Sequence, residues 1–387
     1  MKLEAIELYR LDLALQGPVG TAAGEHRRRP VAFVKVVTDA AVGWGECAAL
    51  SGGTAVDPPL AAVWEQLAGP AARRLVTSAR ACGGHVPPAA QVARLFDASP
   101  PGRMAAAALE MAVLDAELRA GRATASLAGR LGVPPAGDGG RVPVGAMVGI
   151  PADRRAEAVV EAVAAAVSGG AVRVRIKIEP GWDVVPVRAV RAAYPDLLLQ
   201  ADANGSYRLG SEGDDAAERL SALDGAGLAC IEQPLPPADL PALARLSRRL
   251  GTPVCLDESL TSLRRVTDAL RAGACQVACL KPGRLGGLLA ARRAQQACRD
   301  AGAGAFVGGF FETGFARSAH AALAGLPGFT LPGDLSHPDG YLDANPVAYP
   351  PTAGGSVRPY GGPGIAPPPA PGALAGAGAA VVVPADR

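Results

Sequence analysis

Five charged residues stand at the ends of five successive apolar runs in the middle of the chain. The runs VRVRIK, LLLQAD, LACIE, PVCLD and QVACLK end in Lys177, Asp202, Glu232, Asp257 and Lys281. The spacings of 25, 30, 25 and 24 residues are each about the length that a strand, a loop and a crossover helix need. If the runs form neighbouring parallel strands, all five side chains lie at one edge of the sheet. The sequence therefore predicts an α/β fold with a charged rim.

The same rhythm continues on both sides of these residues. Eight strand candidates alternate with Ala-, Leu- and Arg-rich helical stretches, at 142–150, 172–178, 196–203, 228–233, 253–258, 276–281, 304–311 and 329–335. Eight β/α units within about 200 residues are typical of a TIM barrel. A doubly wound open sheet also alternates, but its ligands gather at one switch point and not at many consecutive strand ends. We therefore predict a TIM-type (β/α) barrel over residues 134–340, entered through a linker at PPAGDGG (134–140).

The region before the barrel predicts a different architecture. The segments LEAIELYRL, VAFVKVVT and VGWGE within residues 1–50 alternate with period two, which predicts a small antiparallel sheet. Residues 58–132 predict helices, and MAAAALEMAVLDAELRAG is the strongest of them. The segment GPVGTAAGEHRRRP (17–30) is polar, glycine-rich and long for a hairpin. We interpret it either as a lid or binding loop, or as a disordered connection.

The last 37 residues, 351–387, are rich in Pro, Gly and Ala. Within them GGSVRPYGGPGIA can return to the first domain. The final stretch GALAGAGAAVVVPADR is either a last strand or a frayed tail.

Composition excludes several classes of function. A net charge of +2 and an aromatic content of 4% give no reason to expect nucleic-acid binding. No apolar run approaches 18 residues, and the N-terminus alternates apolar with charged residues, so neither a membrane span nor a signal peptide is expected. The seven cysteines form no C-x-x-C pair and are expected to be buried free thiols in a reducing cytoplasm.

The three acids at the strand ends have the chemistry of a metal site. Asp202, Glu232 and Asp257 offer hard oxygen ligands, which suit Mg²⁺, or Mn²⁺ in its place. A single acid after a strand is more often a loop acid or a helix N-cap. Three in succession at one rim repel one another unless a cation lies between them.

The two lysines are candidate bases. In VRVRIKI the pleat places Arg175 and Lys177 on one face, which must be the barrel interior because helices cover the outside. A neighbouring cation and partial burial both lower the pKa of a lysine toward neutrality, where it can take a proton. Lys281 enters from the opposite side of the barrel. The alternative is that both lysines only neutralise the acids. With the metal, they predict α-proton abstraction next to a carboxylate through an enediolate.

At these residues the chain resembles the enolase superfamily, in its muconate-lactonising branch, and most of all o-succinylbenzoate synthases and N-acylamino acid racemases. The matching strings are RIKIEPGWD (175–183), LLLQADANGSY (197–207), IEQPL (231–235), LDES (256–259), LKPGRLGG (280–287), GGFFETG (308–314) and PGDLS (332–336). With GWGE (43–46) and ALEMAVLDAEL (108–118), the resemblance covers nearly the whole chain. Each string alone is weak, and together they are specific.

The resemblance implies an α+β capping domain built from residues 1–133 and the returning segment 341–387. It implies Mg²⁺ on the three acids, with Lys177 as base and Lys281 on the opposite face. Arg175 stands where the family's K-x-K motif has its first lysine; it keeps the charge but does not give up its proton. The resemblance also supplies candidate substrate-binding residues, namely Asn204, Arg284, Gly309, Glu312 and, in the 17–30 segment, His26. A solvated loop histidine is the alternative for His26.

The predicted function is therefore a Mg²⁺-dependent o-succinylbenzoate synthase in menaquinone synthesis. Racemisation of N-succinylamino acids is the alternative within the same fold. Cycloisomerisation of muconate, dipeptide epimerisation, sugar-acid dehydration and a catalytically silent barrel are weaker options. The predicted partners are a small carboxylate substrate and further copies of the chain in a homo-oligomer, in the cytoplasm and without nucleic acid or membrane.

Overall fold

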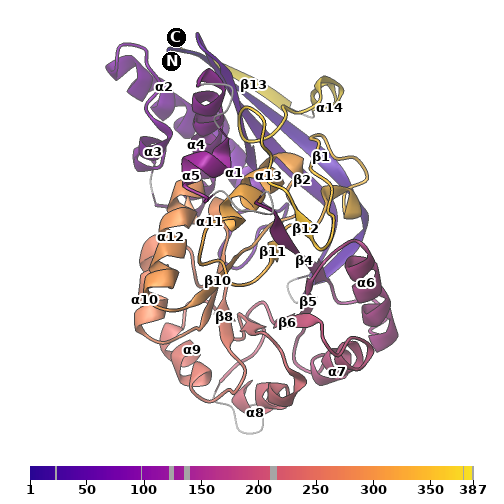
Figure 1. The fold of residues 1–387 in the computed structure, drawn as a ribbon. Coiled ribbons are helices and arrows are strands. Elements are labelled where there is room, and N and C mark those ends of the chain that lie inside the picture. The colour runs from indigo at the N-terminus through magenta and orange to yellow at the C-terminus, as the bar shows by residue number, and fades with distance from the viewer. Residues whose placement is uncertain are drawn as a thin grey trace.

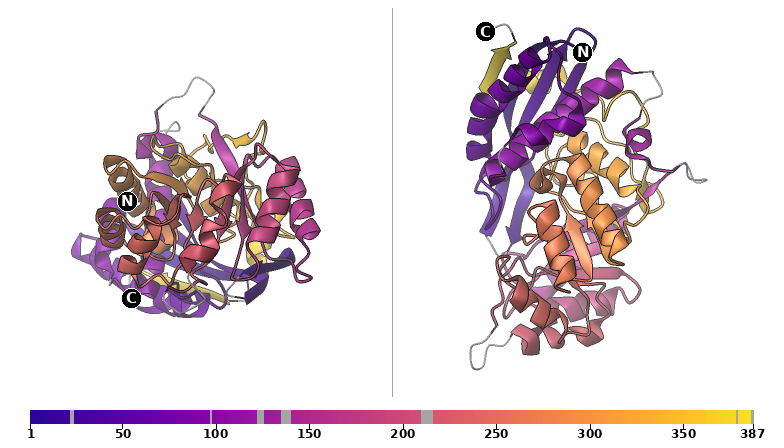
Figure 2. Two further views of the ribbon diagram at one scale, coloured as in Figure 1. Left: turned by 90° about the horizontal axis from the view of Figure 1, so that it is seen from below. Right: turned by 90° about the vertical axis from the view of Figure 1, so that its left-hand side faces the viewer.

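The computed structural model describes residues 1–21, 24–96, 98–121, 126–134, 140–209, 216–377 and 379–385. An antiparallel sheet with its helices forms one end of the molecule, which we call the cap, and a parallel barrel ringed by helices forms the other (Figures 1 and 2). Both chain termini lie in the cap (Figure 1). The predicted TIM-type barrel with an α+β capping domain is confirmed.

The cap sheet has the strand order β13-β1-β2-β3 and is antiparallel throughout. Its strands are β1 (Leu3–Thr21), β2 (Gly24–Thr38), β3 (Val42–Cys47) and β13 (Ala379–Pro384). The C-terminal stretch thus forms a last strand beside β1, as one of its two interpretations held. The cap helices are α1 (Leu60–Gln66), α2 (Ala72–Ala81), α3 (Ala89–Val92), α4 (Pro100–Ala120) and α5 (Leu127–Leu131), with a π-helical turn at Leu67–Ala71 and a 3₁₀ turn at Ala93–Leu95.

Helix α4 packs directly against strand β3 because β3 contains two glycines. A Cβ atom on Gly43 would lie 2.1 Å from the Ala112 carbonyl oxygen, and one on Gly45 would lie 2.1 Å from that of Ala108. The alanine-rich helix and the glycines of GWGE therefore bring two backbones into close contact. Although α4 is long, no helix in the described ranges is both long and apolar enough to cross a membrane.

The barrel strands follow one another in the order β10-β9-β8-β7-β6-β5-β4-β11, and all are parallel. All eight predicted strands form: β4 (Val142–Val148), β5 (Arg173–Lys177), β6 (Leu198–Asp202), β7 (Ile231–Glu232), β8 (Val254–Leu256), β9 (Val277–Leu280), β10 (Gly304–Val307) and β11 (Gly333–Asp334). The outer helices are α6 (Ala156–Ser168), α7 (Val184–Ala193), α8 (Ala216–Ser221), α9 (Leu240–Ser247), α10 (Leu263–Arg271), α11 (Pro282–Leu285), α12 (Leu288–Asp300) and α13 (Gly314–Ala324), with 3₁₀ turns at Asp224–Ala226 and Pro338–Gly340.

The C-terminal segment contacts both parts before it reaches the cap sheet. Strand β12 (Ser356–Val357) pairs antiparallel with β4, and the Ile365 amide donates to the Asp115 carboxylate of α4 at 2.7 Å. A short helix, α14 (Pro371–Ala375), precedes β13. The predicted linker at 134–140 lies mostly outside the described residues, and the domain boundaries stay predictions.

The conformation of the segment 17–30 corrects the sequence analysis, which interpreted it as a lid or binding loop, or as a disordered connection. Strands β1 and β2 continue through it to a tip where Thr21 faces Gly24, so the described part is a long β-hairpin. Interstrand backbone hydrogen bonds override the glycine-rich composition here. The hairpin reaches the barrel mouth, where the Ile150 amide donates to the Gly20 carbonyl at 3.0 Å. A Cβ on Gly20 would lie 2.4 Å from the Ile150 oxygen, so this contact needs glycine.

Two side chains of the cap hold the barrel through buried hydrogen bonds. Arg29 of β2 is 1% exposed and donates to the carbonyl oxygens of Phe310 at 2.7 Å and Phe311 at 3.1 Å, beyond β10. It also donates to the cap carbonyl of Ala49 at 2.9 Å. Glu46 of β3 accepts hydrogen bonds at the start of α13, two of them from Thr313 at 2.9 and 2.6 Å. The cap and the barrel are thus joined at the loop that follows β10.

Replacing Arg29 with methionine should lower the free energy of unfolding by about 3 kcal/mol or more, because several buried carbonyls lose the guanidinium that donates to them. The neighbouring Arg27 is the matched control, since its side chain is 72% exposed. Urea denaturation of Arg29→Met and Arg27→Met measures the difference. A similar small loss in both variants would contradict the role of Arg29.

Helix α4 also carries a buried acid at the start of α12. Glu110 is 1% exposed and accepts a hydrogen bond from the Leu289 amide at 3.1 Å. Burial raises the pKa of its carboxyl to about 7, although the amides at the start of α12 act in the opposite direction. Gly287 is required beside it, because a Cβ there would lie 2.3 Å from the carboxylate.

The stability of the protein should therefore fall as pH rises through this range. The folded chain keeps the Glu110 proton up to about pH 7, whereas the unfolded chain releases it near 4.5. Between these values the folded state binds more protons, so rising pH favours unfolding. Glu110→Gln removes this titration and should gain about 2 kcal/mol relative to the parent between pH 5 and pH 8. The exposed Glu65→Gln is the control in urea denaturation at both pH values, and an equal change in both variants would refute the assignment.

Candidate active site

The five charged strand ends meet at one rim, as predicted. Strands β5 to β9 are consecutive neighbours, and Lys177 faces Asp202, which faces Glu232, in the registers of the sheet. All five residues are buried, with Asp202 and Glu232 fully inaccessible and Lys281 9% exposed. Since Lys177 ends β5 and Lys281 directly follows β9, they approach from opposite sides of the rim.

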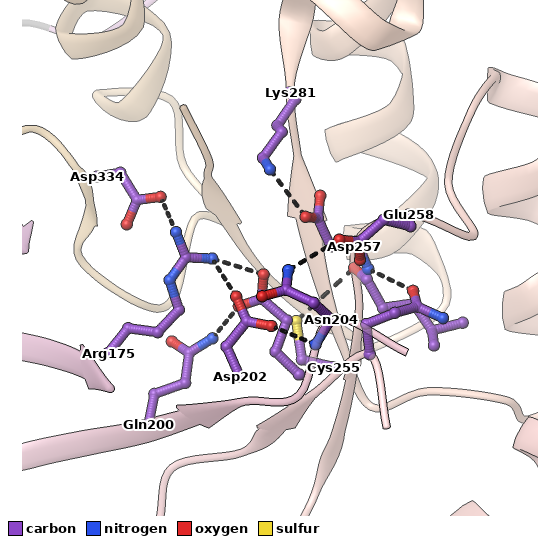
Figure 3. A network of polar contacts seen from close by, with 12 residues as sticks. Arg175, Gln200, Asp202, Asn204, Cys255, Asp257, Glu258, Lys281 and Asp334 are labelled. Carbon is purple, nitrogen blue, oxygen red and sulfur yellow. Dashed lines mark hydrogen bonds and ion pairs between the residues drawn. The ribbon is translucent and has the colours of Figure 1, made fainter. Parts of the chain in front are cut away.

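The β5 side of the rim is a chain of ion pairs (Figure 3). Lys177 Nζ lies 2.6 Å from Asp202 Oδ2 and 2.8 Å from Asn204 Oδ1. Arg175 lies between two acids, with Nη1 2.5 Å from Glu232 Oε1 and Nη2 2.5 Å from Asp334 Oδ2. Arg175 therefore neutralises a predicted metal ligand and does not stand free as a base.

The deeper layer of the same strand is neutralised in the same way. Arg173 donates from Nη2 to Asp334 Oδ1 at 2.8 Å and from Nε to the Pro332 carbonyl at 3.0 Å. Its guanidinium lies 4.9 Å from the centre of the Phe306 ring, which faces it across the barrel interior. Asp334, from the PGDLS string, is thus the partner that the sequence analysis did not find for the interior arginines.

The β9 side of the rim is tied to the cap. Lys281 Nζ lies 2.8 Å from Asp257 Oδ2 (Figure 3), and Arg284 Nη1 donates to the other oxygen of Asp257. Arg284 also forms a two-point ion pair with Asp57, from Nε to Oδ1 at 2.8 Å and from Nη2 to Oδ2 at 2.6 Å. Asp57 comes from the cap segment SGGTAVDPP, so Arg284 links a cap residue to Asp257 of the rim.

Burial and the charged neighbours shift the pKa values of the two acids Glu232 and Asp257 in opposite directions. Burial raises the pKa of Glu232 to about 8; Arg175 lowers it, and Asp202 and Asp257 add to the rise. Burial acts in the same sense on Asp257, but Arg284 and Lys281 outweigh it and hold its pKa well below the usual range. For Lys281, burial is outweighed by Asp257, and the pKa of its ammonium is raised. At the β9 end the ion pair therefore favours the charged lysine.

The donor set fits a divalent cation. Glu232, Asp257 and Cys279 each place one ligand atom within 4.8 Å of the other two, which is close enough for one ion, and no other such group occurs among the residues that the structure describes. Asp202 lies beside this group, turned toward Lys177 and the Asn204 amide. The ion pairs and hydrogen bonds of the rim join five cations with six acids. The cations are Arg173, Arg175, Lys177, Lys281 and Arg284, and the acids are Asp57, Asp202, Glu232, Asp257, Glu258 and Asp334. When every acid is ionised, one negative charge is in excess.

A cavity of about 610 Å³ opens above the rim, between the barrel and the cap hairpin. Seven of the predicted residues line it: Arg175, Lys177, Asn204, Lys281, Arg284, Gly309 and, from β2, His26. His26 is half-buried, and burial, Arg29 and Lys177 all lower its pKa, so a neutral imidazole faces the cavity. It is not the solvated loop histidine of the alternative interpretation.

Glu312 is the predicted substrate-binding residue that the structure places elsewhere. It is 2% exposed, does not line the cavity, and accepts a hydrogen bond from the Phe310 amide at 2.6 Å. Arg317 Nη2 lies 3.1 Å from its carboxylate. A Cβ on Gly309 would lie 2.7 Å from Glu312 Oε2, so Gly309 stands between Glu312 and the cavity. Glu312 is therefore one partner of a buried ion pair under the loop after β10.

Residues 157–369 match the family model of the enolase C-terminal domain-like proteins. The chain belongs to the enolase superfamily. An N-succinylamino acid racemase from an Amycolatopsis species is 41% identical over 366 residues, which are 94% of this chain and 94% of that protein. An o-succinylbenzoate synthase from Geobacillus stearothermophilus is 36% identical over 367 residues, which are 94% of this chain and 93% of that protein.

The fold agrees with this superfamily. A solved structure from Alicyclobacillus acidocaldarius, described as a probable mandelate racemase, is 36% identical with a TM-score of 0.84, and the match covers 100% of both chains. The predicted resemblance is confirmed, and so is the prediction that the chain is an enzyme of this superfamily. The role of each site residue stays a prediction.

The ion pair between Asp57 and Arg284 should stabilise the protein because both partners are buried, with the Asp57 side chain 2% exposed. Burial raises the pKa of Asp57, but Arg284 outweighs it and lowers the pKa. Asp57→Asn leaves Arg284 with Asp257 alone and should cost about 3 kcal/mol of unfolding free energy. Asp12→Asn breaks the exposed pair with Arg28 and should cost less than about 1 kcal/mol. Equal losses in urea denaturation would show that the cap segment does not depend on Arg284.

Proposed function

We propose that this chain is a Mg²⁺-dependent o-succinylbenzoate synthase, which removes water from a cyclohexadiene carboxylate by syn elimination in menaquinone synthesis. The observation that carries the proposal is the pair of lysines, Lys177 and Lys281, which line one cavity from strands β5 and β9. Each lies within hydrogen-bond distance of a carboxylate, at 2.6 and 2.8 Å. The 36% identity to a synthase over nearly the whole chain supports it.

The composition of the chain supports a chemical role for these two lysines. Only four of its 38 lysine and arginine residues are lysines: Lys2, Lys35, Lys177 and Lys281. Arginine supplies the positive charge nearly everywhere else, including Arg175 two residues before Lys177 on the same face. An arginine cannot give up its proton in a protein, whereas a lysine can. Lysine therefore stands at the two rim positions where a proton-accepting group is useful.

The residues that would hold the metal are Glu232 and Asp257, with Asp202 beside them. The excess negative charge of the rim and the oxygen donors suit Mg²⁺, and Mn²⁺ takes similar ligands. When bound there, the ion supplies positive charge for the substrate carboxylate and for the charge that develops on it.

Residues of the chain carry out the proton transfers and supply further positive charge. Lys177 accepts the α-proton and then, as the ammonium, protonates the departing hydroxyl on the same face, which gives the syn geometry. Its contact with Asn204 at 2.8 Å holds Nζ at the end of β5. Lys281, 2.8 Å from Asp257 and 4.6 Å from the centre of the Phe310 ring, contributes positive charge on the other face. The hairpin and the Asp57 segment of the cap limit the access of water.

Racemisation of N-succinylamino acids is the second candidate. The 41% identical relative bears that name, and two lysines on opposite faces can serve as two bases. In this reaction Lys281 must also accept a proton, against the ion pair with Asp257. The synthase needs Lys281 only as a cation, and for this reason we place it first. The homo-oligomer and the cytoplasmic location stay predictions.

The deciding experiment is ¹H NMR of the purified enzyme with Mg²⁺ in D₂O, in two separate reactions. One contains the cyclohexadiene carboxylate precursor of o-succinylbenzoate and the other an N-succinyl-L-amino acid. We expect aromatic product in the first reaction, and we expect that chelation of the metal abolishes it. α-Deuterium exchange with inversion in the second would establish the racemase. Silence in both reactions would overturn the proposed function.

The lysine variants test the assignment of roles in the same assay. Lys177→Ala should lower the synthase rate by at least about 10³-fold, the scale of a lost general base, with the fold unchanged. Lys35→Ala is the control, because Lys35 pairs with Glu7 on the cap sheet, away from the cavity. Turnover retained by Lys177→Ala would refute its role as the base.

A further inference from the structure

The barrel has no helix after its last strand. Strands β4 to β10 are each followed by a helix, whereas β11 is followed by the 3₁₀ turn Pro338–Gly340 and no helix among the residues that lead to β12, all of which the structure describes. Helix α7 packs along one flank of α6 (Figure 1). The other flank of α6, where a last helix would pack, consists of small residues that recur with the helical period: Ala158, Ala162, Ala165, Ala166 and Gly169.

The cavity above the rim extends onto this flank. All five small residues line it, and so do Ala146 and Val148 of β4. A Cβ on Gly145 would lie 2.4 Å from the Arg173 guanidinium in the barrel interior, so the alternation of β4 turns Met147 inward and its two neighbours outward. Since Met147 also lines the cavity, the cavity passes from the interior of the barrel to the outside of β4. We call the outer part, between α6 and the two outward residues of β4, the apolar arm.

The passage to the apolar arm lies between β4 and the segment after β11. These two strands pair over only two positions, Val144 with Gly333 and Gly145 with Asp334. Beyond them the cavity is lined by β4 on one side and by Ser336 on the other. At the far end of the arm Ala165 and Gly169 are exposed, so the arm opens to solvent.

Two buried arginines on the wall of the same cavity have donors without a partner. Among the described residues, none accepts a hydrogen bond from Nε or Nη1 of Arg317, or from Nε of Arg175. Arg317 Nη2 donates at 2.8 Å to the hydroxyl of Tyr341, which also lines the cavity. Buried donors are nearly always satisfied, so these groups indicate a ligand with an anionic acceptor.

We propose that the cavity binds a carboxylic acid with a linear apolar chain, whose carboxylate lies toward Arg317 and whose chain lies in the apolar arm. The walls of the arm are alanine, glycine and valine, which offer a chain apolar contact and no polar partner. Each methylene that leaves water there should raise the affinity about fourfold. The chain can belong to a free fatty acid or to a substrate that carries it as a substituent. The inference does not rest on the synthase reaction, which places no chain in the arm.

The test is isothermal titration calorimetry of the full-length protein with acetate, hexanoate and decanoate. We expect one decanoate per chain, bound at least about tenfold more tightly than hexanoate. Ala162→Phe fills the arm and should remove this gain. Glu161→Phe is the matched control, because Glu161 is exposed on the same helix and does not line the cavity. Arg317→Lys removes the unpartnered donors and should weaken hexanoate and decanoate by the same factor.

Circular dichroism shows whether each variant is folded, and Ala166→Leu replaces Ala162→Phe if that variant does not fold. Equal affinity for hexanoate and decanoate in the parent, or a gain with chain length that persists in a folded arm variant, would overturn the proposal. Unchanged affinities in folded Arg317→Lys would overturn the placement of the carboxylate.

A second measurement distinguishes the two sources of the chain. It follows exchange of the α-proton of N-decanoyl-L-alanine by ¹H NMR with Mg²⁺ in D₂O. Exchange would assign the chain to a substrate, and decanoate binding without exchange would assign the arm to a free acid. The calorimetry is read without turnover, so its failure is distinguishable from a failure of the synthase reaction.

Discussion

The structure depends on the neutralisation of buried charge at the barrel rim. Six carboxylates and five cations are withdrawn from water there, and each of them contacts an opposite charge or a polar group. Isolated charges in such a place would cost many kcal/mol. The interior arginines, the rim lysines and the Asp57 segment are therefore parts of one arrangement, and a change in any of them alters the charge felt by its neighbours. With every acid ionised, the remaining negative charge suits the cation of the proposed function.

The cap completes this arrangement and covers it. Its hydrogen bonds to the barrel pass mainly through backbone groups: Arg29 reaches the carbonyls after β10, and Glu46 accepts from the amides that begin α13. Such contacts depend on the course of the backbone and little on which side chains line the cavity. The hairpin that carries His26 and the segment that carries Asp57 can therefore differ in their side chains while the cap keeps its position. The proposed function thus assigns substrate selection to the cap and proton chemistry to the barrel strands.

The sequence analysis found the rim because the period of a strand and the spacing of β/α units are local properties. A residue that ends a parallel strand must lie at the carboxyl edge, so Lys177 and Lys281 were placed without knowledge of the packing. The hairpin at 17–30 was missed because pairing with a partner strand overrides a glycine-rich composition. Glu312 was misplaced because its string shows only that it follows β10. The fold of the loop turns its carboxylate behind Gly309, toward Arg317. Asp57 and Cys279 carried no signal, since a lone acid in a loop and a cysteine in an apolar strand are common.

By itself, the sequence determined the barrel, the three acids and two lysines of its rim, and the superfamily, because these follow from periodicity, strand-end chemistry and short specific strings. Only the tertiary structure decided which charge neutralises which, that the cap segments reach the site, and that a thiol lies beneath the carboxylates. These are contacts between residues far apart in the chain, such as Asp57 with Arg284 and Arg173 with Asp334. Their distances depend on how the whole chain closes, and no local pattern encodes them.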